Sequence, residues 1–399
     1  MSLAGRVAPP SMADARRARP THPKGFEPGV RFSVDSGLPE TATISSTTEI
    51  DAADHRARIE EQTGLTIPAN LDVRLERLTL QNGAEGVERW WYKYLFVPRA
   101  DVVALDAYDH VATLKALRKD RTPKAPKFTG ESTFVLSFND WQAGKSTGGG
   151  TPELLRRFSA QVDAAAARAT ELRRIGRDLG RLVILGGGDM VEGCVIYPNQ
   201  AFELDLDGRR RQINVVTDMV LDALDRLAPL FAEVTVLAVG GNHGENRIAG
   251  NRTSRHDNDD CLVFENAARA TERDPRLQHV NFVIAQDEPA KTLDVNGWVI
   301  GTTHGQAFGK GAGRPEQKAH NWYKGQAGGR FPAGDCDVLV SHHYHHYSLR
   351  DWGACLWVQT PANDGGSPQH TDLTGECAES GMLSFVVTPG CRYQDAQIL

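Results

Sequence analysis

Short apolar runs alternate with longer amphipathic stretches over the last two thirds of the chain. The runs have the composition of buried strands: FVLSF (134–138), LVIL (182–185), VTVLAV (234–239), WVIG (298–301) and VLV (338–340). Residues 151–180, between the first two runs, predict a long helix with Thr151 as N-cap, Pro152 in its first turn and Gly180 at its end. Strands that alternate with helices indicate an α/β domain whose largely parallel sheet is covered on both faces.

The first third of the chain has a different pattern. Residues 1–49 are rich in Arg, Pro and small residues, show no apolar period, and are expected to form a disordered tail. A helical pattern over 51–64 and strand patterns over 73–80 and 90–97 predict a small α+β domain at 50–113. Residues 114–127 carry many Lys and Arg side chains and two prolines, which predicts a basic linker, or alternatively a strap against a polyanionic substrate.

Composition narrows the class of protein. With 40% hydrophobic and 24% charged residues the chain is an ordinary globular protein, and its net charge of −6 disfavours a surface that is basic throughout. No apolar run reaches the roughly 20 residues that span a bilayer, and the first residues lack the apolar core of a secretory signal, so we expect no membrane partner and a cytoplasmic location. The six cysteines form no CxxC pair, which predicts free thiols.

Side chains that bind metals follow each of the five apolar runs. In chain order they are Asn139, Asp140 and Gln142; Asp189 and Glu192; Asn242 and His243; His304; and the cluster His342, His343, His345 and His346. Ligand sites in open α/β sheets lie beyond the carboxyl ends of the strands, so these segments are expected to converge. Carboxylate, amide and imidazole donors together suit Mn, Fe, Zn or Ni better than Ca or Mg. The sequence therefore predicts a transition-metal site.

The order of these segments resembles the signature of the calcineurin-like metallophosphoesterases, D-x-H, G-D-x-x-E/D, G-N-H-D/E, H and G-H-x-H. The matching segments are residues 140–142, 188–192, 241–243, 304 and 343–345. The resemblance implies that residues 128–399 form an α/β fold in which a β-sandwich is flanked by helices, in four α/β/β/α layers. The D-W-Q triplet at 140–142 is similar to that of actinobacterial and phage proteins related to DNA-repair exonucleases.

The same resemblance implies two divalent metal ions bridged by Asp189. One ion would be bound by Asp140, Gln142, Asp189 and His345, and the other by Asp189, Asn242, His304 and His343. Gln142 offers a neutral amide oxygen where the family has an imidazole, so Mn²⁺ is expected, with Zn²⁺, Fe²⁺ and Ni²⁺ as alternatives. His243 resembles the family histidine that hydrogen-bonds the phosphate or protonates the leaving oxygen, so His243 and Asp189 are the expected catalytic residues.

Four flanking residues are candidates for supporting roles. Glu192 and Glu245 are expected to orient metal ligands, and Arg247 and Lys145 to hold phosphate.

Other features near the motifs are less specific. His342 stands where the family has glycine, so its imidazole is expected to point away from the metals. Gly244, inserted before the acidic residue of the third motif, is expected to displace that residue. The cluster at 322–324 either stacks a nucleobase or packs under a loop, and residues 360–367 either shape the rim of the site or form a plain loop.

The reaction that this pattern predicts is hydrolysis of a phosphoester. We expect a Mn²⁺-dependent phosphodiesterase acting on nucleic acid, with the N-terminal domain helping to select the substrate. Two alternatives stay open: hydrolysis of a small nucleotide or a phosphoprotein, which the acidic net charge favours, and a non-catalytic binding or assembly protein with a weakened metal site, which Gln142 favours. Cleavage polarity, the physiological metal and the formation of a homodimer are left open by the sequence.

Overall fold

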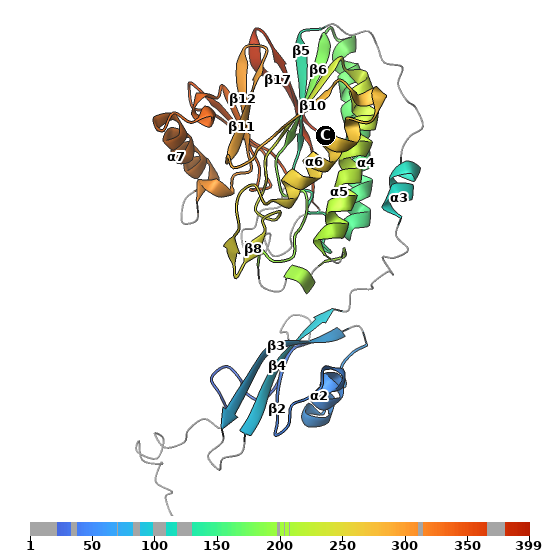
Figure 1. The fold of residues 1–399 in the computed structure, drawn as a ribbon, viewed down its shortest axis with the longest axis vertical. Helices are drawn as coiled ribbons and strands as arrows, with labels where there is room; N and C mark the ends of the chain where they lie inside the picture. Colours follow the sequence, from blue (N-terminus) through green and yellow to red (C-terminus); the bar gives the residue numbers. More distant parts are fainter. Residues whose placement is uncertain are drawn as a thin grey trace, which may run out of the picture. The chain divides into compact units, whose positions relative to one another are not determined.

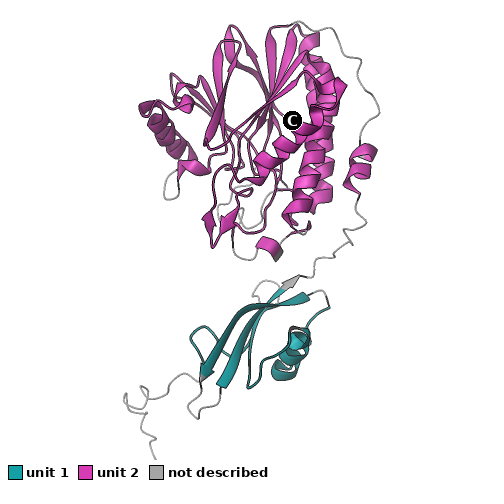
Figure 2. Cartoon of the chain, viewed as in Figure 1, with its two compact units in different colours: residues 1–103 teal, residues 104–399 magenta. Residues whose placement is uncertain are grey.

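The computed structural model describes residues 22–32, 38–69, 71–82, 88–98, 109–117, 130–197, 200–202, 204–206, 208–309, 314–364 and 380–399. The chain divides into two compact units, residues 1–103 and 104–399 (Figure 2). No helix within the described ranges is both long enough and apolar enough to cross a membrane.

The first unit is a four-stranded antiparallel sheet with one helix packed on it (Figure 1). Its elements are β1 (Gly29–Phe32), β2 (Pro39–Ser46), a 3₁₀ turn (Ala52–Asp54), α2 (His55–Thr63), β3 (Leu71–Asn82) and β4 (Glu88–Pro98), and the strand order is β1-β2-β4-β3. Ile59 of α2 is fully buried in a cluster with Ile44 of β2 and Tyr92 and Tyr94 of β4. The helix and both strands expected in this part are confirmed.

The expectation of a disordered tail over 1–49 is wrong for β1 and β2. Strand β2 reads PETATISS, and only Ala42 and Ile44 join the core of the unit from it. An inward face made of one small and one large apolar residue gives almost no period-2 signal, which is why the strand is hard to recognise in the sequence. Residues 1–21 and 33–37 of the expected tail lie outside the described residues.

The second unit contains two mixed sheets and five helices of eight or more residues among the described ranges. The six-stranded sheet has the order β10-β7-β6-β5-β16-β17, with β5 (Ser132–Phe138), β6 (Leu179–Gly186), β7 (Glu233–Ala238), β10 (Val280–Ile284), β16 (Leu383–Thr388) and β17 (Cys391–Ile398). The five-stranded sheet has the order β11-β12-β13-β15-β14, with β11 (Ala290–Val295), β12 (Trp298–Thr303), β13 (Val338–Ser341), β14 (Ser348–Asp351) and β15 (Leu356–Gln359). The remaining elements are α3 (His110–Leu117), α4 (Gly150–Arg174), α5 (Arg209–Leu227), the short strands β8 (Arg247–Ile248) and β9 (Asn251–Arg252), α6 (Asp259–Thr271), α7 (Pro315–Gly328) and five 3₁₀ turns (Gln200–Phe202, Ala228–Leu230, Pro275–Leu277, Gln306–Phe308 and Pro332–Asp335).

All five apolar runs are strands, but they divide between the two sheets. Strands β5, β6 and β7 lie parallel in the first sheet, and β12 and β13 lie parallel in the second. Side chains from both sheets, among them Val135, Leu237, Ile300 and Val340, share one buried cluster. One face of each sheet is therefore covered by the other sheet, and the expectation of a single sheet with helices on both faces is corrected.

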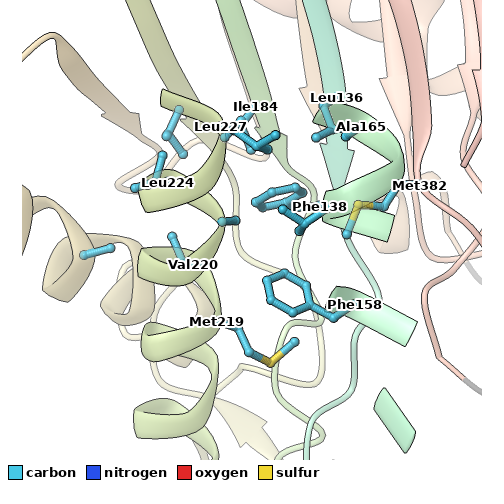
Figure 3. Close-up of a cluster of buried hydrophobic side chains, with 14 of the residues drawn as sticks. Leu136, Phe138, Phe158, Ala165, Ile184, Met219, Val220, Leu224, Leu227 and Met382 are labelled. Atoms are coloured by element: carbon cyan, nitrogen blue, oxygen red, sulfur yellow. The ribbon is translucent and has the colours of Figure 1, made fainter. Parts of the chain in front are cut away.

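Helices pack against each of the two sheets. Figure 3 shows Phe138 of β5 and Ile184 of β6 in the same cluster as Phe158 of α4 and Met219 of α5. On the five-stranded sheet, α7 contributes Trp322 and Tyr323 to a second cluster that includes Trp357 of β15. Residues 322–324 were expected either to stack a nucleobase or to pack under a loop. Both aromatic side chains pack against this cluster, which favours a packing role.

The long helix α4 is shorter than expected. It ends at Arg174, and Gly176 has a φ of 98°, a left-handed conformation common where helices end. Gly180 lies instead in β6, where an added Cβ would be 2.1 Å from the carbonyl oxygen of Gly130. The N-cap is Gly149, and the Thr151 hydroxyl donates a hydrogen bond to a nearby aspartate at 2.7 Å.

Helix α3 belongs to the second unit, not to the expected N-terminal domain and linker. Leu114 is buried in the same cluster as the apolar residues of α4 and α5. His110 Nε2 lies 2.6 Å from a carboxylate oxygen of Asp218 on α5. A linker cannot include residues 114–117, and residues 118–129, with the other basic residues of the expected strap, lie outside the described residues.

Candidate metal centre

The five motif segments meet at the carboxyl ends of β5, β6, β7, β12 and β13. His304, after β12, places its Nε2 2.9 Å from an oxygen of Asp189, after β6. His345, after β13, places its Nε2 3.2 Å from an oxygen of Asp140, after β5. The Asn242 amide oxygen, after β7, lies 3.2 Å from His304 Nε2. These contacts join the two sheets at one site.

Asp189, His304 and His343 form the first group of potential ligands. Each has one donor atom within 4.8 Å of the donor atoms of the other two, and Asp189 and His304 are buried. The Nδ1 of His304 lies 2.8 Å from the carbonyl oxygen of Gly187, which turns Nε2 toward the carboxylate. A buried carboxylate and two imidazoles are donors that fit a divalent transition metal.

Asp140 and His345 meet at a second position, the second donor group, for which Gln142 is the third expected ligand. One oxygen of Asp140 accepts a hydrogen bond from the Asn139 amide at 2.8 Å, while the other is buried, with His345 Nε2 at 3.2 Å but no aligned hydrogen-bond donor. A buried carboxylate oxygen without an aligned hydrogen bond is costly, and a cation would compensate its charge. The Gln142 amide oxygen, however, accepts a hydrogen bond from Lys145 at 2.9 Å.

Most of the predicted ligands have a strained backbone. Nine non-glycine residues with a described conformation have a positive φ, and five of them are predicted ligands: Asp140 (49°), Gln142 (46°), Asp189 (51°), His343 (77°) and His345 (59°). Such a conformation costs a non-glycine residue about 1–3 kcal/mol and persists mainly where function requires a particular side chain. Glycine would relieve this strain but would supply no donor atom.

Burial and nearby carboxylates set the charges of the histidines. Burial opposes a charged imidazole at His304, but Asp189 and Asp140 outweigh it and raise the pKa of His304 to about 9. Burial lowers the pKa of His343 to about 4, so its ring is neutral and able to coordinate. Burial also lowers the pKa of His342 to about 3.

The imidazole of His342 contacts two threonine hydroxyls. Its Nε2 lies 3.0 Å from the hydroxyl of Thr302, and its Nδ1 lies 2.7 Å from the hydroxyl of Thr360. An added Cβ at Gly187 would be 2.3 Å from this ring, so the imidazole fills the space beneath the β6 turn.

His243 lies beside both groups. Its backbone N–H donates to Asp189 at 2.7 Å, and its Nδ1 lies 2.9 Å from the carbonyl oxygen of Glu192 and 3.3 Å from the Glu192 carboxylate. Burial opposes the charged ring, but Asp189 and Glu192 raise the pKa of His243 to about 10. Its Nε2 lies 3.5 Å from the Gln142 amide nitrogen. The ring can therefore carry a proton at Nε2 toward the site.

The expected supporting residues differ in what they contact. The Glu192 carboxylate, held by Tyr197 at 3.0 Å, contacts His243. The Glu245 carboxylate accepts hydrogen bonds from Arg247 at 2.6 and 3.0 Å, and the backbone N–H of Glu245 donates to the Asn242 carbonyl oxygen at 3.4 Å. Arg247 is thus paired with a neighbouring carboxylate.

Two contributors to the site were missed by the sequence analysis. Asp364, within the segment 360–367, places its carboxylate 2.5 Å from Lys145 Nζ and 3.7 Å from His345 Nδ1. Residues 365–367 of that segment lie outside the described residues. Asp260, fully buried at the start of α6, accepts hydrogen bonds from four backbone N–H groups, those of residues 189, 190, 191 and 241. The only local signal for Asp260 is the D-N-D-D sequence before an apolar helix.

Asp260→Asn is expected to lower the free energy of unfolding by about 2 kcal/mol, because one of its oxygens becomes an NH₂ group that faces backbone N–H donors. Urea unfolding measures the effect. Asp287→Asn, which changes an exposed carboxylate, is the matched control and should change little. An unchanged unfolding midpoint in Asp260→Asn would show that the four contacts do not hold the loops.

Comparisons with known proteins give distant structural likenesses. No family model and no curated protein matches the sequence. Among solved structures, the chain is similar to vacuolar protein sorting 29 from Cryptosporidium parvum, with 12% identity, 64% of this chain and 86% of that chain covered, and a TM-score of 0.31. It is similar to an archaeal phosphodiesterase, with 11% identity, coverage of 67% and 99%, and a TM-score of 0.30. The Zn²⁺ complex of Vps29 from Entamoeba histolytica gives 11% identity, coverage of 67% and 98%, and a TM-score of 0.28.

Proposed function

We propose that this chain is a metal-dependent phosphoester hydrolase. The observation that carries the proposal is the meeting of two donor groups from five strand ends. One group is Asp189, His304 and His343, and the other contains the buried oxygen of Asp140 that lies 3.2 Å from His345 Nε2. Backbone strain at five of the predicted ligands supports a role that glycine could not fill.

Asp189, Asn242, His304 and His343 would hold one divalent cation, and Asp140, Gln142, Asp189 and His345 the other. Such cations bind phosphate oxygens, lower the pKa of water and stabilise the charge that develops in phosphoester hydrolysis. Asp260 and the Gly187 carbonyl oxygen fix the positions of Asp189 and His304. His243, whose Nδ1 is held by the Glu192 carbonyl oxygen, would donate a proton from Nε2 to the leaving oxygen.

The proposed substrate is a nucleic-acid phosphodiester, and the proposed metal is Mn²⁺. The D-W-Q triplet at 140–142 supports the substrate class through its resemblance to nuclease-related proteins, and the neutral Gln142 oxygen supports the metal. The four-layer α/β/β/α arrangement and a substrate-selecting role for the small N-terminal unit belong to the same proposal. A small phosphoester remains the alternative, which the net charge of −6 favours.

The proposed metal-dependent hydrolysis is tested by removing bound metal and then adding it back. Protein stripped with a chelator should not hydrolyse bis(p-nitrophenyl) phosphate, and Mn²⁺ should restore the activity. Activity on single-stranded DNA that exceeds activity on p-nitrophenyl phosphate would support the nucleic-acid substrate, and the reverse order would favour the small phosphoester. A chain that binds no transition metal tightly would contradict the proposed function and favour a binding protein.

A further inference from the structure

The side chain of Lys145 lies at the second donor group. Its Nζ donates to the Gln142 amide oxygen at 2.9 Å and lies 2.5 Å from a carboxylate oxygen of Asp364. The Lys145 side chain is 19% exposed and that of Asp364 is 5% exposed. The backbone N–H of Lys145 also donates to the Gln142 carbonyl oxygen at 3.0 Å, which fixes the backbone of Lys145 beside Gln142.

The ammonium and a divalent cation would share the same oxygen. Gln142 offers one amide oxygen to the second group, and two positive charges close to that oxygen repel each other strongly where water is largely excluded. Asp364 compensates part of the Lys145 charge and also anchors it in place. The Asp189 group is different, because the contacts of His304 there are the Gly187 carbonyl oxygen, the Asn242 amide oxygen and a carboxylate.

We propose that Lys145 makes the two metal positions unequal. One divalent cation binds tightly at Asp189, His304 and His343. At Asp140, Gln142 and His345 the Lys145 ammonium holds the amide oxygen, so the second cation binds at least about tenfold more weakly. The inference rests on the proposed function, since it takes both groups as metal positions. The chain would then load its second cation only when that cation is abundant.

Titration of metal-free protein with Mn²⁺, followed by calorimetry and electron paramagnetic resonance, tests this inference. Wild type should bind one equivalent tightly and show the six-line spectrum of an isolated Mn²⁺ ion. Lys145→Met should bind its second equivalent at least about tenfold more tightly and show a spin-coupled spectrum at two equivalents. Lys145→Arg, which keeps the charge, should behave like wild type.

Lys291→Met is the matched control, because Lys291 pairs with Glu288 in a different part of the unit and its loss removes the same charge. Two equally tight equivalents in wild type, or an unchanged second affinity in Lys145→Met with the fold intact, would overturn the inference and leave the proposed function standing. Failure of wild type to bind any Mn²⁺ tightly would instead overturn the proposed function. The two failures are therefore distinguishable.

Discussion

Asp189→Asn is expected to reduce hydrolysis by roughly 10³-fold or more. One carboxylate oxygen of Asp189 lies 2.9 Å from His304 Nε2, and the other accepts the backbone N–H of His243 at 2.7 Å. The asparagine amide keeps the size of the side chain but loses the charge that holds a cation. In either orientation its NH₂ group faces His304 Nε2 or the backbone N–H of His243. Turnover of bis(p-nitrophenyl) phosphate, measured together with bound metal, gives the result.

Asp287→Asn is the control for this change, because Asp287 is exposed and its substitution alters the net charge equally. Wild-type turnover by Asp189→Asn with a full complement of metal would mean that Asp189 is not a ligand. Loss of the protein's thermal transition would indicate misfolding instead, so both variants are compared with wild type in a thermal melt.

His243→Ala is expected to lower hydrolysis of a dinucleotide by roughly 10²-fold while bound metal stays unchanged. His243 is not among the proposed ligands, and its Nδ1 is held by the Glu192 carbonyl oxygen at 2.9 Å, which leaves Nε2 for a leaving oxygen. A p-nitrophenolate leaving group needs little protonation, so the loss on bis(p-nitrophenyl) phosphate should be smaller. Comparing kcat/KM for the two substrates separates proton donation from phosphate positioning.

Equal losses on both substrates would exclude proton donation and leave His243 as a residue that positions phosphate. His256→Ala is the control, because His256 is an exposed histidine in the segment that follows the same motif. Its activity should match that of wild type on both substrates.

The sequence predicts the strand ends of the site well, because each strand and its polar residue are neighbours in the sequence. A buried strand is a short apolar run, and the polar residue that follows it is visible in the same few letters, as with Asp140 after FVLSF and His304 after WVIG. The division of these strands between two sheets is not local. It depends on which apolar faces meet, and a run such as VLV reads the same in either sheet.

Supporting contacts are harder to predict because they join distant segments. Asp260 lies 71 residues after Asp189 in the chain, and Asp364 lies 219 residues after Lys145. Nothing in the letters around either aspartate indicates its partner. Lys145 was expected to hold phosphate, and only its contact with the Gln142 oxygen shows that it shares an oxygen with a proposed metal position.

Five predicted ligands have a left-handed backbone, and this conformation lowers stability at positions that the proposed activity requires. Glycine adopts this conformation without a steric cost, so selection for heat resistance alone would enrich glycine at residues such as Asp140 and His343. A library of variants screened only for folding would accumulate more stable chains in which glycine has replaced one or more of these ligands. Efforts to make this protein more durable should therefore keep these five positions fixed and seek their gains elsewhere.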